Sequence, residues 1–204
     1  MQGELVSLHP ALTDADYATL ADWSSSISSV YSSGQVQPFT GPKLREAAEQ
    51  AQTHFLMVRD REGKTVGGVN WRPMTYDGHF EVGNAIGEPE LWGLGYGVES
   101  VLLLLDHLFH QRNAHRIHLL TASFNKRMVQ IFTSGPITVE GILRDYFFLD
   151  GQYHHAVVGS ILRAEYYDAL TSADRQRLDL VPPQDKVDAS TLLRKFLDEN
   201  PVAL

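Results

Sequence analysis

The stretch His79–Arg112 has the sequence HFEVGNAIGEPELWGLGYGVESVLLLLDHLFHQR, and the rest of the chain is organised around it. As far as Gly87, successive side chains alternate with the two-residue period of a strand. Three glycines then allow a tight turn, Gly93, Gly95 and Gly97. Apolar residues at helical spacing follow and predict a buried helix that starts in the turn: Val98, Val101, Leu102, Leu105, Leu108 and Phe109.

This glycine turn is suited to hold a phosphate. The free N–H groups of a first helical turn, together with the helix dipole, favour an anion. The glycines are spaced two apart and no Lys-Ser or Lys-Thr pair follows them, so the dinucleotide fingerprint and the P-loop are both excluded. The alternative is a purely structural role, because three glycines can also simply make a tight turn.

Composition narrows the class of protein. The 204 residues suit one main domain with a substantial core. The net charge is −8 with scattered Lys and Arg, which argues against nucleic acid as a partner. The absence of cysteine excludes disulfides, thiolate metal sites and a cysteine nucleophile. The chain starts without a signal pattern and its longest apolar run, Val101–Leu105, is too short for a membrane span, so we expect a cytoplasmic protein without membrane contact.

Elements on both sides of the central stretch predict a mixed α/β sheet rather than a doubly wound one. Helices are expected after a cap at Thr13 or Asp14, from Gly41-Pro42 and over 125–132. The Ser-rich segment Ser24–Gly34 is either a short helix, a mobile loop over a substrate site or an irregular connector, and the connector is favoured. Strands are expected at 5–8, 55–59, 66–71, 79–87, 116–122, 141–149 and 153–162.

The C-terminal part of the chain differs in composition. From Thr171 the sequence becomes polar, and Pro182-Pro183 interrupts it. We therefore expect a domain over residues 1–170 and an extension over 171–204. The extension would carry a short amphipathic helix that packs on the domain or on another subunit, with the apolar residues Leu192, Leu193, Phe196 and Leu197.

Several motifs together resemble the GCN5-related N-acetyltransferase (GNAT) superfamily, in the branch that acetylates ribosomal-protein N-termini and many small amines. They are Val82–Ile86 before Trp92–Glu99, Asn125 after the next strand, Glu140–Asp145 with Asp150–Tyr153, and the tail Ser160–Tyr166. The resemblance spans residues 5–167 in element order. It implies the GNAT fold, a mixed and mostly antiparallel sheet with a splayed central strand pair and flanking helices.

The resemblance also implies a co-substrate, acetyl-CoA or another acyl-CoA. Backbone N–H groups of residues 93–98 would hold its pyrophosphate, and the pantetheine arm would enter between the central strand and the strand at 116–122. An acceptor amine would approach from the opposite side. The residues implied to bind the co-substrate are Asn84, Ala85, Ile86, Trp92, Gly93, Leu94, Gly95, Tyr96, Gly97, Val98 and Asn125.

Direct attack of an amine on a thioester needs a base. Glu81 on the central strand, close to the implied thioester, is the first choice, and a salt bridge on a half-exposed face is its alternative. A histidine, His154 or His155, is the second choice, since strand alternation points only one of them at the site. Histidine pairs elsewhere lack the carboxylate or cysteine ligands that would complete a metal site, so no metal is expected.

The chain departs from the family at three places. The two usual proton donors are replaced by Phe132 and Met128, and the turn carries Glu88 and Glu90 with no basic residue. The third departure is Ser134–Ile137, where the family usually has Gly-Phe. The leading hypothesis is an N-acyltransferase that moves an acetyl or other acyl group from acyl-CoA to a small-molecule or peptide amine. Its alternatives are an acyltransferase that uses an acyl carrier protein as donor, and a CoA-binding protein without turnover. A homodimer is left open.

Overall fold

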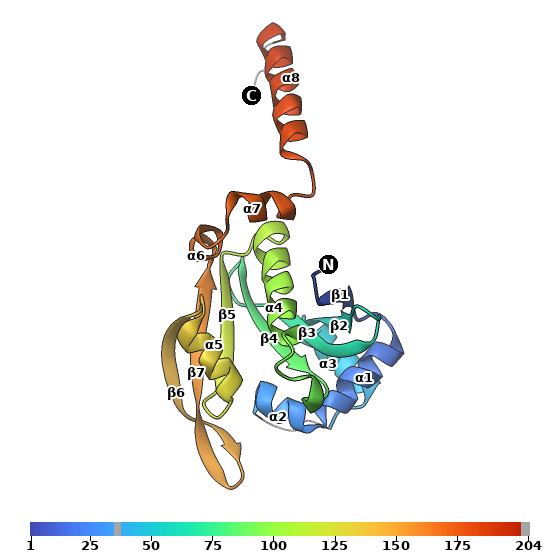
Figure 1. The fold of residues 1–204 in the computed structure, drawn as a ribbon, viewed down its shortest axis with the longest axis vertical. Helices are drawn as coiled ribbons and strands as arrows, with labels where there is room; N and C mark the ends of the chain where they lie inside the picture. Colours follow the sequence, from blue (N-terminus) through green and yellow to red (C-terminus); the bar gives the residue numbers. More distant parts are fainter. Residues whose placement is uncertain (35–37, 201–204) are drawn as a thin grey trace. The chain divides into compact units, whose positions relative to one another are not determined.

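The computed structural model describes residues 1–34 and 38–200 and divides the chain into two units, residues 1–165 and 166–204 (Figure 1). The first unit contains a seven-stranded sheet in the order β1-β2-β3-β4-β5-β7-β6. Neighbouring strands are antiparallel except β4 and β5, so the predicted mixed and mostly antiparallel sheet is confirmed. The strands are β1 (Val6–Pro10), β2 (His54–Asp60), β3 (Thr65–Pro73), β4 (His79–Ile86), β5 (Arg116–Ala122), β6 (Thr138–Leu149) and β7 (Gln152–Leu162).

The two parallel strands in the middle of the sheet separate. Only three pairs join them, His79 with Arg116, Phe80 with Ile117 and Glu81 with His118. Beyond these pairs β4 and β5 diverge towards the end where α2 lies (Figure 1). The splayed central pair that the family resemblance implies is therefore present.

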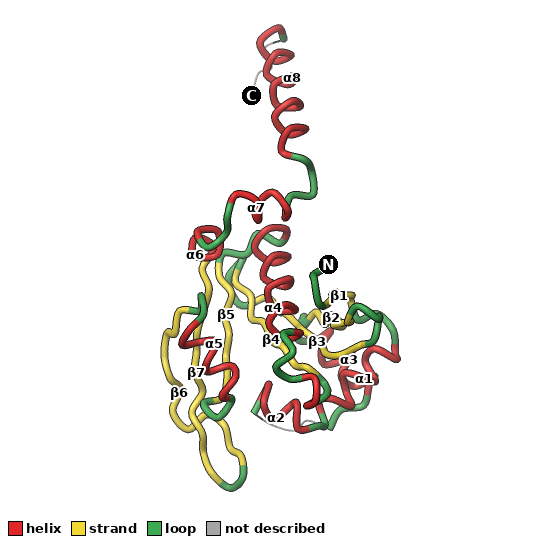
Figure 2. The backbone as a smooth tube through the Cα atoms, in the orientation of Figure 1, coloured by secondary structure: helices red, strands yellow, loops and turns green. Residues whose placement is uncertain are grey.

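Helices α1 (Asp14–Ser24) and α3 (Gly41–Gln50) begin where the capping and proline signals predict. Thr13 and Asp16 cap each other's backbone at the start of α1. Between α1 and α3 lies another helix, α2 (Ile27–Ser33), so the prediction of an irregular connector over this segment is wrong (Figure 2). Serines compete for backbone hydrogen bonds and weaken a helix, but burial of Val30, which is 7% exposed, favours it here.

The central helix buries part of the predicted face, since Leu105, Leu108 and Phe109 are buried as predicted. It consists of α4 (Tyr96–Asp106), which continues as a π-helical turn over His107–Gln111. Val98 and Leu102 of the predicted face are 51% and 50% exposed. Since residues 101–105 are apolar all round the helix, hydrophobic spacing alone does not select a face. The buried residues are Ser100, Leu104, Leu105, Leu108 and Phe109.

A short 3₁₀ turn (Pro89–Leu91) precedes the glycine turn, and α5 (Lys126–Ser134) follows β5. The β6–β7 hairpin closes the sheet, with irregular register between Leu143 and Phe147. The remaining helices are α6 (Arg163–Asp168), α7 (Ser172–Leu178) and α8 (Pro183–Glu199). The predicted C-terminal helix is thus 17 residues long and begins at Pro183, and its apolar residues Leu192 and Phe196 are exposed. None of the helices in the described ranges has the length and apolarity that a bilayer span requires.

Candidate active site

The glycine turn presents a row of free backbone donors. Gly93 and Gly95 have φ angles of 87° and 91°, and Gly95 caps the start of α4. Only glycine adopts such angles without strain. Within the described part of the chain, the N–H groups of residues 93–98 have no hydrogen-bond acceptor. The carboxylate of Glu99 turns away from them and accepts N–H donors from Glu4, Leu5 and Val6, each at 2.7 Å.

Asn84 connects the central strand to this turn. Its Nδ2 donates to the carbonyl oxygen of Gly97 at 2.8 Å. Its Oδ1 is buried and has no partner in the described structure. A buried acceptor without a donor is costly, so the position favours a ligand that carries an N–H group. The amides of a pantetheine arm are such donors, and the residues here therefore fit an acyl-CoA.

Trp92 is hydrogen-bonded to the end of the central strand. Its Nε1 donates to the carbonyl oxygen of Ile86 at 3.0 Å. The predicted pantetheine partner Ile86 therefore has its carbonyl bonded within the chain. Ala85 pairs with Gly68 of β3.

The structure brings a cation to the turn, which the sequence prediction lacked. The Cζ of Arg127, on α5, lies 5.0 Å from the centre of the Trp92 ring. Among the described residues, Arg127 has no carboxylate within ion-pair distance. The turn itself carries no basic residue, as the sequence shows, but folding brings the Arg127 guanidinium, 35 positions after Trp92, beside it. The sequence feature that could have pointed to Arg127 is its position two residues after Asn125, at the start of a helix.

Asn125 joins α5 to α2. Its Oδ1 accepts from the N–H of Met128 at 3.2 Å and caps α5, and its Nδ2 donates to the carbonyl oxygen of Tyr31 at 2.7 Å. The side chain is 7% exposed and thus well fixed. Both ends of this amide, predicted to bind the co-substrate, are hydrogen-bonded to backbone in the structure.

Two of the three predicted bases, Glu81 and His154, lie on one face of the sheet and the third, His155, lies on the other. Glu81 forms an ion pair with Arg72, with 2.9 Å between Oε1 and Nη2, as its structural alternative predicted. His154 contacts the Phe124 ring at 5.1 Å, whereas Nδ1 of His155 accepts from the N–H of Asp145 at 3.0 Å. Glu81 pairs with His118, and strand alternation from His118 to Ala122 and its partner Ala156 puts Glu81 and His154 on one face. His155 therefore points to the other face.

Comparison with known proteins is consistent with this geometry. The acetyltransferase (GNAT) domain family matches residues 6–134, more than half of the chain. The chain belongs to the GNAT acetyltransferase family. Spermidine N(1)-acetyltransferase of Escherichia coli K12 is 30% identical over 78 residues, which are 38% of this chain and 42% of that enzyme. An uncharacterized N-acetyltransferase, p20 of Bacillus licheniformis, is 31% identical over 118 residues, or 57% of this chain and 65% of that protein.

Among solved structures, the spermidine N-acetyltransferase of Vibrio cholerae in complex with CoA and spermine superposes with a TM-score of 0.70 at 22% identity. The match covers 81% of this chain and 99% of that one and shows that the GNAT fold is shared. The chain spans less than half the length of the Escherichia coli enzyme in the sequence match.

The hydroxyl groups that GNAT enzymes usually place on the helix after Asn125 are absent. Phe132 is 2% exposed, and a Cβ built on Gly159 would lie 2.8 Å from its ring. Phe132 is thus a packing residue of the core between α5 and β7. Met128 offers its backbone N–H to Asn125 and no side-chain proton.

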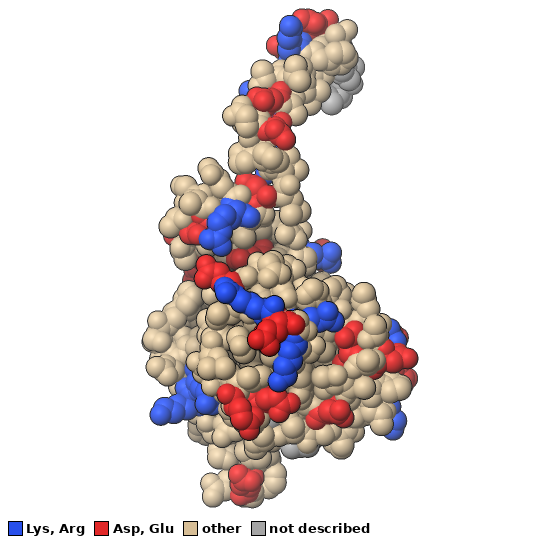
Figure 3. Space-filling model, turned by 45° about the vertical axis from the view of Figure 1, so that its right-hand side comes forward, with Lys and Arg blue, Asp and Glu red and all other residues tan. Residues whose placement is uncertain are grey.

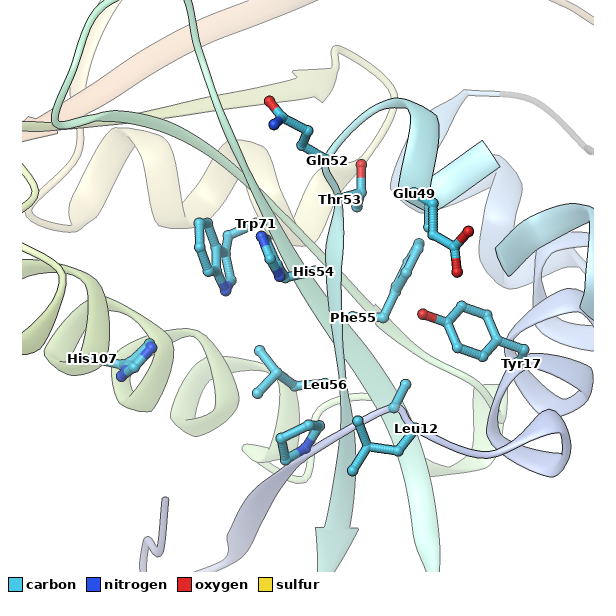
Figure 4. A pocket seen from close by; sticks show the side chains of 13 residues that line it. Leu12, Tyr17, Glu49, Gln52, Thr53, His54, Phe55, Leu56, Trp71 and His107 are labelled. Carbon is cyan, nitrogen blue, oxygen red and sulfur yellow. The ribbon is translucent and has the colours of Figure 1, made fainter. Parts of the chain in front are cut away.

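A pocket of about 530 Å³ lies elsewhere in the unit, between β1–β3 and the ends of α1 and α3 (Figure 4). His54 stacks on Trp71 there with 4.0 Å between ring centres, and burial together with Arg112 lowers the pKa of His54. Tyr17 and Glu49 line the opposite side. None of the residues predicted from the sequence for catalysis or co-substrate binding lines this pocket.

Proposed function

We propose that this GNAT protein is an N-acyltransferase that moves an acetyl group from acetyl-CoA to an amine. One observation carries the proposal: the unpartnered amides of residues 93–98 and the unpartnered Oδ1 of Asn84 meet where β4 and β5 diverge. Donors for a pyrophosphate and an acceptor for an amide N–H, in a gap between two strands, match the parts of coenzyme A in their order along the molecule.

In the proposed reaction, some residues of the site bind the coenzyme and one removes a proton from the amine. The amides at the start of α4 and the Arg127 guanidinium bind phosphate, and Asn84 Oδ1 accepts from the pantetheine arm. The coenzyme supplies a thioester, whose carbonyl the amine attacks. Glu81 is the first-choice base that removes a proton from the amine, and His154, on the same face of the sheet, is the second. The nitrogen–carbon bond forms, the carbon–sulfur bond breaks and its electron pair stays on sulfur.

Arg127 supports coenzyme A as donor over a carrier protein. Both donors present the same pantetheine arm, but only the coenzyme adds a pyrophosphate and a ribose phosphate. Acidic and basic side chains are interspersed on the face shown in Figure 3. A guanidinium without a carboxylate partner beside the turn stabilises those extra negative charges. The carrier-protein donor is therefore the weaker alternative.

The motifs support the branch that acetylates ribosomal-protein N-termini, whereas the curated relatives with a named activity act on spermidine. The acceptor is then a small-molecule or peptide amine. The absence of cysteine supports the cytoplasm as the place of action. We keep residues 1–170 as the acyltransferase domain and 171–204 as an extension, whose exposed apolar side chains on α8 support a homodimer.

A protein that binds the coenzyme without turnover is the second candidate, favoured by the missing hydroxyls at Phe132 and Met128. The deciding experiment combines calorimetry with acetyl-CoA and a thiol-release assay over polyamines, aromatic amines and peptides with free N-termini. Binding with amine-dependent thiol release supports the acyltransferase. Binding without release from any amine supports the second candidate, and the absence of binding overturns both.

A further inference from the structure

Aromatic rings from five separate parts of the chain form a continuous series at the open end of the gap. Tyr31 of α2 contacts the Trp92 ring at 5.2 Å and the Phe124 ring at 6.4 Å. Phe124 in turn contacts Phe147 of β6 at 6.3 Å and His154 of β7 at 5.1 Å. All four contacts are edge-to-face. We call these five residues the aromatic wall.

The glycine turn lies on one face of the sheet. Asn84 and Ile86 both approach Gly97 at the start of α4, so this face carries the even-numbered residues of β4. Phe80 of that set pairs with Ile117 of β5, so Ile117 and, two positions later, Leu119 point to the same face. Leu119 pairs with Gly159 of β7, and Phe132 of α5 packs over Gly159 on this face. The turn and α5 therefore share a face, on which the phosphates are expected.

Three members of the aromatic wall, Phe124, Phe147 and His154, lie on the opposite face, whereas Trp92 borders the glycine turn and contacts Arg127 of α5. Ala122 is three positions beyond Leu119, so it points the other way, and it pairs with Ala156. These two alanines and Phe147 form one buried cluster, against which Phe124 packs. Glu81 and His154, the two leading bases, lie on this same face. An acceptor amine that reaches a thioester from the side opposite the phosphates would therefore meet the wall.

The wall is apolar and lacks carboxylates. Its members are four aromatic residues and a histidine, and the charged group in contact with one of them is the cation Arg127. Of the acids near the wall, Glu81 pairs with Arg72 and Asp145 contacts His155 on the other face, while Glu88 and Glu90, which precede Trp92, are exposed. A polyamine needs several carboxylates around it, whereas an aromatic or aliphatic body gains from half-exposed rings such as Tyr31, which is 38% exposed.

We infer that the aromatic wall binds the acceptor, and that the acceptor is a primary amine carried on an aromatic or other large apolar group. The inference rests on the proposed acyltransferase function, whose acceptor class it specifies. On this inference, the acceptor of this chain differs in chemistry from the polyamines of its relatives, because the surface that binds it is the aromatic wall.

The test compares phenethylamine with spermidine as acceptors for acetyl-CoA. The wild-type protein should give a kcat/KM for phenethylamine at least about tenfold above that for spermidine. Phe124→Leu should lower the phenethylamine value about tenfold or more and leave the affinity for CoA unchanged. The matched control is Phe148→Leu, at a ring that is 62% exposed on the same hairpin and outside the wall, and it should behave as wild type. Tyr31→Ala is the second wall variant, for the case that Phe124→Leu does not fold.

Ligand-detected NMR with phenethylamine makes the result independent of turnover. Amine acetylation that prefers spermidine, or that responds equally to Phe124→Leu and Phe148→Leu, overturns the inference while the proposed function stands. No acetylation of any amine, with phenethylamine binding that Phe124→Leu abolishes, overturns the proposed function and supports the wall as a binding surface. Neither acetylation nor binding overturns both.

Discussion

The side chain of Asn84 donates from Nδ2 to the carbonyl oxygen of Gly97 at 2.8 Å, while its Oδ1 is buried without a donor. One bond holds the central strand against the start of α4, and the oxygen without a donor belongs to the part of β4 that lies beyond its pairs with β5. A group with half its hydrogen-bonding capacity used for structure and half left open is well placed for a ligand amide.

Asn84→Ala should weaken acetyl-CoA binding. The variant removes the acceptor for the pantetheine amide and the tie to Gly97, and loss of one or two such hydrogen bonds corresponds to about a five- to thirtyfold rise in Kd. Calorimetry with CoA measures the change. Asn70→Ala, on the neighbouring strand β3, is the matched control and should keep wild-type affinity. Unchanged affinity in a folded Asn84→Ala would remove Asn84 from the binding site.

Gly95→Val should abolish detectable binding of the coenzyme while the sheet stays folded. The residue has φ 91°, and a Cβ there would meet Leu5 Cδ1 at 3.0 Å, so the turn has to rearrange. Gly63→Val in the β2–β3 turn is the control, because Gly63 has φ 83° but is not near the predicted phosphate. Circular dichroism reports folding in both variants. Equal loss of binding in both would indicate general destabilisation.

Arg127→Gln should raise the Kd for CoA several-fold and leave binding of acetyl-pantetheine, which lacks the nucleotide phosphates, unchanged. The guanidinium is an added charge for the phosphates, and its effect should shrink as salt rises. Lys126→Gln, one position earlier on the same exposed turn, is the control. Equal effects on the binding of CoA and acetyl-pantetheine would contradict a phosphate-binding role of Arg127 and would favour a carrier protein as the acyl donor.

Local patterns in the sequence account for most of the fold. β5 occupies the predicted residues 116–122, and α3 starts at the predicted Gly41-Pro42, because alternation and a proline at the first helical turn are local signals. The glycine turn was predictable for the same reason. The buried face of α4 was predicted only in part, since residues 101–105 are apolar on every side and only the sheet selects among them.

Relationships between distant residues explain what the sequence did not reveal about the site. Arg127 and Tyr31 reach Trp92 from α5 and α2, and no spacing rule connects those positions. The carboxylate of Glu81 could be placed on a strand but its partner Arg72 came from the neighbouring strand. Site composition therefore depended on tertiary contacts, whereas the elements that carry it depended on local sequence.

Glu81→Gln should lower kcat about a hundredfold or more with little change in the KM for acetyl-CoA, if it is the base that accepts the amine proton. His154→Gln tests the second base on the same face of the sheet. Steady-state rates over a range of pH, with a saturating amine, measure both. Arg72→Gln controls for the ion pair, because a purely structural role of Glu81 would make the Glu81 and Arg72 variants lose activity equally.

Glu140→Gln should remove a pH-dependent part of the folding stability. Hydrogen bonds from Arg116 and Ser160 lower the pKa of Glu140 from 4.5 to about 2. The folded state therefore binds fewer protons than the unfolded state between these two values, so the contribution is fully present above pH 4.5 and is lost as pH falls towards 2. Urea unfolding at several pH values should show that the stability difference between wild type and Glu140→Gln shrinks as pH falls through this window.

Glu62→Gln, in the exposed β2–β3 turn, should give a difference that is small at every pH. A difference that stays constant for Glu140→Gln would mean that Arg116 and Ser160 hold its ionised and protonated forms equally well.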